Sequence, residues 1–240
     1  MEPQGHQWLT IHLARFATAK APGELDHTGP DTAAAWRVGP DGQTGADGMR
    51  SPTSDIWGGL GFYHRKDDAA AAMPTRSTPI AMSSGAQESW HAMLAVVTHR
   101  GDLDLSTMNA PHPRLVPSGE TMTGPIAVMT SAGYTDYDTD DLPRHRAFLA
   151  GVEKVREYYA GLPGNLLRQI INPLMTPNGC TISVWADSAQ MVRAAYKNGV
   201  HKDMLDRHKA APFVDRTSFT RLAILQTSGT WNGHQVPGET

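Results

Sequence analysis

The residues best placed to do chemistry lie between positions 198 and 208, around a histidine. One helix is expected to end at Gly199 and a second to follow it, with His201 in the first turn on the same side as Leu205. A neutral imidazole facing an apolar cavity offers a nitrogen lone pair, as a haem or non-haem iron site requires. The alternative is a structural or solvent-facing histidine, the commoner role of this residue. His208 lies two turns further on, too far to share one metal readily.

Other polar residues could assist such a site. Arg168, Arg193 and Arg221 could each pair with a carboxylate or a propionate, although a surface position is the ordinary one for arginine. His91 and His99 fall on one side of a predicted strand, but the strand rise separates them by about 26 Å. These two histidines therefore cannot bind one metal together.

Composition and missing signatures narrow the classes of function. The chain has 240 residues, 40% apolar and 19% charged, with a net charge of −3, which is typical of a globular protein without a basic field for nucleic acid or anionic lipid. Phosphate-binding loops, dinucleotide fingerprints, zinc-protease helices and nucleophile elbows are missing. A single cysteine, Cys180, excludes internal disulfides and Cys-ligated clusters. With no apolar run of about 20 residues and no signal-peptide pattern, we expect a cytoplasmic protein without a membrane span.

The second half of the chain has to position His201, and its periodicity predicts a complete α+β unit. The expected strands are residues 125–134, 166–171, 180–185 and 219–227. The expected helices run from Asp140 or Asp141 to Gly161, from Asp187 to Gly199 and over residues 201–210. The order β-α-β-β-α-β, with an extra helical turn before the last strand, is that of a ferredoxin-like unit.

The first half is a looser copy of the same order. Strands are expected at residues 8–16, 56–63 and 90–98, with a short helix at 69–73. Residues 21–54 are rich in Gly and Pro, which predicts a long loop that is either disordered or a lid or pocket wall, with Trp36 available for packing.

Residues 101–123 are the expected connection between the halves, because they hold several prolines and little periodicity. We therefore predict two ferredoxin-like units in tandem, residues 1–110 and 124–240, the second carrying the iron site. Packed sheet to sheet, they would form a pseudo-dimeric α/β barrel with a pocket between each sheet and its helices. Because such units often present open sheet edges, a homo-oligomer is expected.

The second half resembles the C-terminal part of the spheroidene monooxygenase family. The similar segments read GPIAVMTSA, CTISVWADSAQMVRAAY with NGVH, and SGTWNG. The first half is similar more thinly, through IWGGLGFYHRKDDAAAA and SWHAMLAVVTHRG. The resemblance implies a dimeric α/β-barrel-like fold and a haem-dependent oxygenase with His201 as the axial ligand. Val200 stands where the family typically has proline, and the divergent first half suggests a substrate other than a carotenoid.

The resulting hypothesis is a haem-dependent, monooxygenase-like oxidoreductase that acts on a small or hydrophobic metabolite. His201 would hold b-type haem, with the open side of the iron reserved for dioxygen or a substrate heteroatom. Trp185 would line the cofactor pocket, Tyr196 would line the pocket and take part in catalysis, and Arg221 would reach a propionate or the distal face. An electron donor protein is an expected partner.

Two alternatives remain open. Haem-containing α/β-barrel proteins also dehydrate aldoximes or rearrange nitrogen–oxygen substrates without incorporating dioxygen, and this chain could do the same. The other alternative is a non-catalytic haem or ligand carrier, or a cofactor-free α/β-barrel protein. Oxygen dependence, binding of carbon monoxide and uptake of hemin separate these hypotheses.

Overall fold

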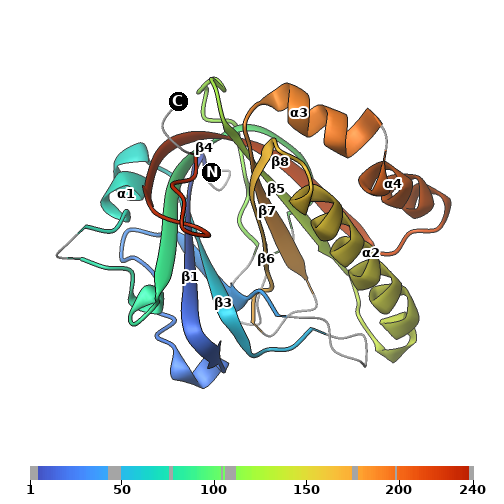
Figure 1. Ribbon diagram of the computed structural model, residues 1–240, viewed down its shortest axis with the longest axis horizontal. Helices are drawn as coiled ribbons and strands as arrows, with labels where there is room; N and C mark the ends of the chain where they lie inside the picture. Colours follow the sequence, from blue (N-terminus) through green and yellow to red (C-terminus); the bar gives the residue numbers. More distant parts are fainter. Residues whose placement is uncertain are drawn as a thin grey trace.

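A single curled antiparallel sheet organises the molecule (Figure 1). The computed structural model describes residues 5–42, 50–75, 78–103, 105, 112–174, 178–197 and 199–237. The strands are β1 (Trp8–Lys20), β2 (Ala35–Pro40), β3 (Ser54–Tyr63), β4 (Glu88–Gly101), β5 (Ile126–Gly133), β6 (Asn165–Ile171), β7 (Gly179–Trp185) and β8 (Arg216–Gly229). The α-helices are α1 (Lys66–Ala71), α2 (Leu142–Ala160), α3 (Ser188–Val192) and α4 (Val200–Ala210).

The strand order confirms the α+β class with two ferredoxin-like units. Across the sheet the order is β2-β3-β1-β4-β8-β5-β7-β6. Within each half the fourth strand lies beside the first, the first beside the third and the third beside the second, as the ferredoxin-like connection requires. The second half has helices in both crossovers. In the first half, a loop with the short 3-10 turn Pro22–Glu24 replaces the first crossover helix, so this half is a reduced copy.

The two halves join edge to edge, through β4 and β8, and share one interior. Trp90 of β4 lies opposite Gly229 of β8, and the antiparallel pairing continues to Gly101 and Ser218. The interior cluster draws on strands of both halves, including Leu9, Ile11, Leu13, Leu60, Phe62, Trp90, Leu94, Ala127, Met129, Leu167, Ile182, Val184 and Leu222. Burial of this cluster is the main source of stability.

The two outer strands of the sheet approach each other and close it toward a barrel. The amide of Asn172, just after β6, donates to the carbonyl of Pro40 at 3.2 Å, and the amide of Leu174 donates to Val38 at 3.2 Å. Gly39 lies between these bonds, where a Cβ atom would overlap the carbonyl of Asn172. The open edges that favoured a homo-oligomer are therefore paired here, and the oligomeric state stays a prediction without that support.

The long loop at residues 21–54 contains more regular structure than the sequence predicts. Strand β2 lies within it and pairs with β3, so the prediction of irregular structure was wrong over Ala35–Pro40. Gly39 and Pro40 suppress the strand signal, yet both are tolerated in a strand that has a ladder partner on one side only. Trp36 packs as expected: its ring occupies the space beside Gly59. Residues 43–49 lie outside the described residues.

Part of the expected connection, residues 101–123, packs into the core. Leu103, Leu105 and Leu115 are buried in the interior cluster, and Leu115 forms a bridge with His6. Positions 104 and 106–111 lie outside the described residues. The division into residues 1–110 and 124–240 stays a prediction.

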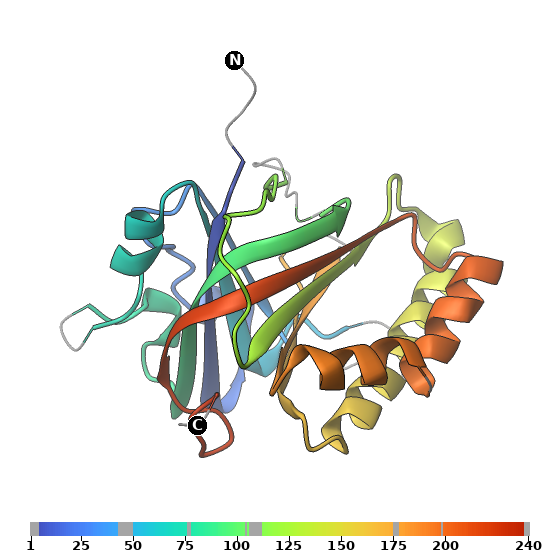
Figure 2. The ribbon, with the colours of Figure 1, turned by 90° about the horizontal axis from the view of Figure 1, so that it is seen from above.

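Helices cover the outer face of the sheet unequally. Figure 2 shows α2, α3 and α4 together beside the second half, while α1 lies against the first half. Helix α1 begins at Lys66, three residues before the predicted start. Among the described residues, no helix has the length and apolar character needed to cross a membrane.

Candidate functional site

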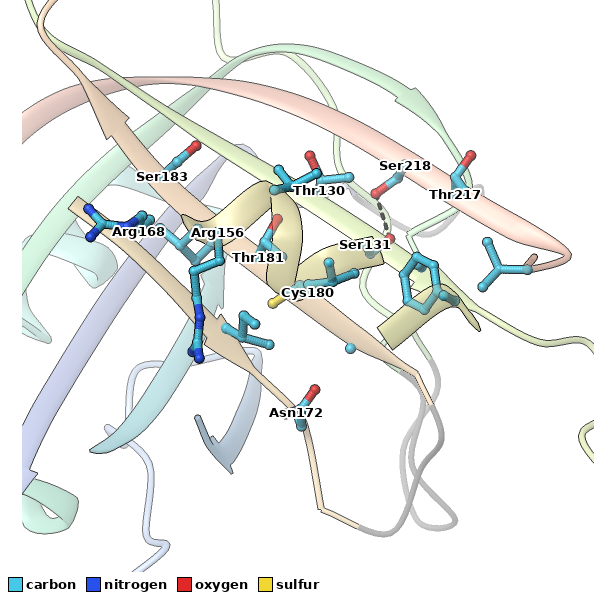
Figure 3. Close-up of a pocket in the computed structure, with 18 of the residues that line it drawn as sticks. Thr130, Ser131, Arg156, Arg168, Asn172, Cys180, Thr181, Ser183, Thr217 and Ser218 are labelled. Carbon is cyan, nitrogen blue, oxygen red and sulfur yellow. Dashed lines mark hydrogen bonds between the residues drawn. The ribbon is translucent and has the colours of Figure 1, made fainter. Parts of the chain in front are cut away.

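A cavity of about 590 Å³ lies between the second half of the sheet and its helices. Its volume is within the range of small-molecule and cofactor sites, roughly 300–1,000 Å³. The floor comes from the outward-facing residues of β5, β6, β7 and β8, and the roof from α2, α4 and the end of α3. Figure 3 shows Arg156 and Arg168 at one end and the hydroxyls of Ser131, Ser218 and Thr217 at the other.

His201 belongs to the wall of this cavity, and its tautomer is fixed by the backbone. Helix α3 passes into a π-helical segment, η4 (Arg193–Lys197), and α4 begins afresh at Val200. Carbonyls at such a helix end lack amide partners, and the carbonyl of Ala195 lies 2.9 Å from Nδ1 of His201. Because a carbonyl only accepts, Nδ1 carries the proton and Nε2 carries the lone pair. Burial lowers the pKa of His201, and the bond to Ala195 offsets this only in part, which favours the neutral imidazole.

Two further histidines line the cavity, and hydrogen bonding distinguishes them from His201. The amide of Phe213 donates to Nδ1 of His208 at 3.1 Å, so a neutral His208 carries its proton on Nε2 and has no lone pair there. Nδ1 of His145 lies 2.9 Å from the hydroxyl of Tyr134, a partner that either donates or accepts and fixes no tautomer. Among the three, His201 alone has an Nε2 lone pair set by an acceptor-only partner. The described residues contain no cluster of three or more His, Cys, Asp or Glu side chains that could hold a metal ion.

Aromatic rings surround the imidazole of His201. Tyr159 of α2 stacks on it with ring centroids 5.8 Å apart and an interplanar angle of 25°, and Trp185 meets Tyr159 edge-on at 4.9 Å. Tyr196 lies edge-on to His201 at 6.4 Å and is 41% exposed. Trp185 and Tyr196, both predicted pocket residues, thus lie in the cavity wall with His201. Burial raises the pKa of Tyr159 and of Tyr196, so both phenols stay protonated at neutral pH.

The three arginines singled out by the sequence occupy different places. Arg168 of β6 lines the cavity. Arg221 of β8 is absent from the described lining residues: its guanidinium lies over Phe219, and its charge lowers the pKa of Tyr196 against the larger effect of burial. Arg193 is exposed and borders a separate, smaller pocket on α3. The structure therefore brings Arg168, rather than Arg221 or Arg193, into the cavity with His201.

The first half contributes one wall of the cavity. Pro40, Arg50 and Pro52 line it, so the described ends of the long loop serve as a pocket wall, as the sequence allowed. Arg50 of this wall lies 3.1 Å from Glu153, and Arg156, also a lining residue, lies 3.1 Å from buried Asp41.

Burial raises the pKa of Asp41 to about 6, an effect that the neighbouring arginines oppose. Gln169 also donates to this carboxylate. The ion pairs tie α2 of the second half to the loop of the first.

Arg156 is a lining residue whose role the sequence pattern could have indicated. Arg156 falls four residues after Val152, within the apolar stripe of the predicted helix, and an arginine in such a stripe marks a buried polar site. Arg50 had no local signal, because its partner Glu153 is distant in the chain.

A second buried polar cluster lies on the first half, away from the cavity. Nδ1 of His12 is 3.0 Å from Nδ1 of His91, and Nε2 of His12 is 2.8 Å from the hydroxyl of Thr10. Burial lowers the pKa of His12 and brings that of His91 to about 4, so both are neutral at pH 7.

Comparison with known proteins supports the fold. No protein-family model matches the sequence, and neither does a curated protein. An aldoxime dehydratase crystallised with butyraldoxime is similar over 94% of this chain and 81% of that chain, at 10% identity with a TM-score of 0.56.

A second aldoxime dehydratase structure covers 93% of this chain and 83% of its own, at 10% identity with a TM-score of 0.53. A candidate monooxygenase from Fusobacterium nucleatum covers 95% of this chain and 96% of its own, at 12% identity with a TM-score of 0.40. The two aldoxime dehydratase structures, each at 10% identity, show the fold alone, and they lend no support to the narrower resemblance to the spheroidene monooxygenase family. The chain is therefore similar in fold to dimeric α/β-barrel proteins.

Proposed function

We propose that the cavity binds b-type haem through Nε2 of His201 and that the protein is a haem-dependent oxygenase of a small or hydrophobic metabolite. The observation that carries the proposal is the bond from Nδ1 of His201 to the carbonyl of Ala195, in the wall of a mainly apolar cavity. A metal-binding histidine ordinarily donates its other ring nitrogen to such an acceptor, which sets the tautomer and raises the basicity of the ligand.

The residues around His201 fit a haem. The cavity is lined by apolar and aromatic side chains and holds the cation of Arg168, a suitable partner for a propionate. When bound, haem would supply redox chemistry at an open coordination position, where dioxygen or a substrate heteroatom could bind.

The chain's own part is to bind, to orient and to exclude water. Ala195 holds the His201 ring in one orientation, and Tyr159 stacked on that ring limits its rotation. Trp185 closes the space beside Tyr159, and its indole donates to Ser183 at 2.9 Å. We propose that Tyr196, in the cavity wall, takes part in catalysis and that Arg221 acts on it through its charge, which lowers the pKa of Tyr196. An oxygenase of this kind needs reducing electrons, for which we propose a separate donor protein.

A second candidate is dehydration of an aldoxime or a related nitrogen–oxygen substrate. The similarity in fold to an aldoxime dehydratase crystallised with butyraldoxime supports it. Both functions would need His201 to hold the haem, but only the oxygenase would need dioxygen.

The test is an absorption spectrum of the purified protein with and without hemin, for the wild type, His201→Ala and His208→Ala. We expect a Soret band that shifts with carbon monoxide on reduction, is lost or displaced in His201→Ala and is kept in His208→Ala. The His208 variant is the matched control because its Nε2 carries a proton. Turnover of butyraldoxime without dioxygen would favour the dehydratase. A wild type that takes up no hemin would contradict the proposal and leave a cofactor-free protein or a ligand carrier.

A further inference from the structure

The charge on the cavity wall is one-sided. The described lining residues include four arginines and no aspartate or glutamate. The whole chain has a net charge of −3, so an excess of cations here is not a general bias of composition. A recess lined by one sign of charge favours ligands of the opposite sign.

Three of the four arginines are accounted for without a ligand. Arg50 has Glu153 at 3.1 Å, and Arg156 has Asp41 at 3.1 Å and Glu153 at 2.8 Å. Arg100 is exposed to solvent. Arg168 is the cation of the wall that remains.

Arg168 has weak support from its neighbours in the described part of the chain. Its one hydrogen bond there is a 3.4 Å contact from Nη1 to Oδ1 of Asn165. Burial lowers the pKa of Arg168, and the charge of Arg156 lowers it further. An anion beside Arg168 would relieve both the loss of water and the repulsion between the two guanidinium groups.

One uncharged donor of the cavity lies next to Arg168. Ser183 is its partner across the β6–β7 ladder, and because Ser183 Oγ already accepts from Trp185, its hydroxyl proton is available to a ligand. Asn165 does not belong to the described lining residues, and its part is to accept from Arg168. A guanidinium and a hydroxyl together match a carboxylate, which only accepts.

We propose that Arg168 and Ser183 form a carboxylate-binding subsite in the cavity, for a ligand with an acidic group on an apolar body. The inference rests on the proposed function only in placing the ligand in the same cavity. A carboxylate could come from an organic acid substrate or from a haem propionate. The two sources share the chemistry and are separated by experiment.

The test compares Arg168→Gln with wild type in two arms, with Arg193→Gln as the matched control because Arg193 is exposed and outside the cavity. In the first arm calorimetry measures octanoate and 1-octanol binding to protein without haem. In the second, absorption titration measures hemin and hemin dimethyl ester. Ser183→Ala is a second variant that keeps the test valid if Arg168→Gln folds poorly, and circular dichroism checks folding.

The outcomes separate the sources. Suppose that Arg168→Gln binds octanoate at least tenfold more weakly than the wild type but binds 1-octanol equally well, and that Arg193→Gln binds both as the wild type does. This result supports the subsite with an organic acid as its ligand. If Arg168→Gln binds hemin more weakly than the wild type but binds hemin dimethyl ester equally well, the subsite is supported with the propionate as its ligand. If Arg168→Gln and Ser183→Ala bind all four probes as the wild type does, the subsite is overturned. Wild-type binding of octanoate through Arg168 without uptake of hemin keeps the subsite and contradicts the haem proposal.

Discussion

At the scale of single residues, histidines in this protein are sorted by their hydrogen-bond partners. Ala195 fixes His201 with a lone pair on Nε2, and Phe213 fixes His208 in the opposite tautomer. The sequence could indicate that His201 follows a helix break, but it could not indicate a carbonyl turned toward Nδ1, because that depends on η4 and the restart of α4.

Because His12 and His91 are buried, we expect the protein to lose stability in acid. Both have a folded-state pKa below the ordinary value, so the unfolded chain takes up protons first as the pH falls below about 6.5. The free energy of unfolding should therefore decrease between about pH 6.5 and pH 4, by at most about 1.4 kcal/mol per pH unit for one histidine. Urea unfolding across this range should show a shallower decrease in His91→Gln. The same decrease in wild type and His91→Gln would contradict the prediction, and exposed His234→Gln is the control.

At the scale of elements, the periodicity of the sequence predicts most strands and the long helix α2. The elements that it does not predict depend on backbone geometry or on partners distant in the chain. Strand β2 has little signal of its own and is held by β3 and by the segment after β6. The start of α4 is set by backbone geometry, since Gly199 has φ of 99°, a conformation that L side chains rarely adopt.

Substituting Gly199 should disturb both stability and His201. An added Cβ would lie 2.9 Å from the hydroxyl of Tyr158, and the positive φ adds strain of about 1–3 kcal/mol. We expect Gly199→Ala to lower the free energy of unfolding by this order and to weaken hemin binding, because the first turn of α4 carries His201. Thermal unfolding and hemin titration measure the two effects. Gly161→Ala is the control, since Gly161 has a helical φ of −83° and its nearest neighbouring atom is 3.7 Å away; an equal effect there would contradict the argument.

At the scale of the whole molecule, the two halves share one interior and should unfold together. Leu94 of β4 is fully buried, and the interior cluster around it includes Leu222 of β8 and Ile182 of β7. The order of the strands in the second half was predictable from the order of its elements. Strand β2 and the joining of the two halves through β4 and β8 were not, because no local pattern specifies them.

Leu94→Ala should therefore destabilise both halves. Its cavity should cost about 2–5 kcal/mol of unfolding free energy. Native-state hydrogen exchange is expected to show reduced protection in β5 and β7 as well as in β1 and β4. Protection in the second half that stays at the wild-type level would mean that the halves are independent folding units.

Because the two units lie in one chain, each half can change its sequence independently of the other. In a symmetric dimer every substitution appears twice, and both copies must keep the same face. Here one outer face holds a cavity beside α2, while beside Gly59 of the other half the space is filled by Trp36 and Met82. Asymmetry of this kind lets the first half supply a wall, through Arg50 and Pro52, to the cavity of the second half.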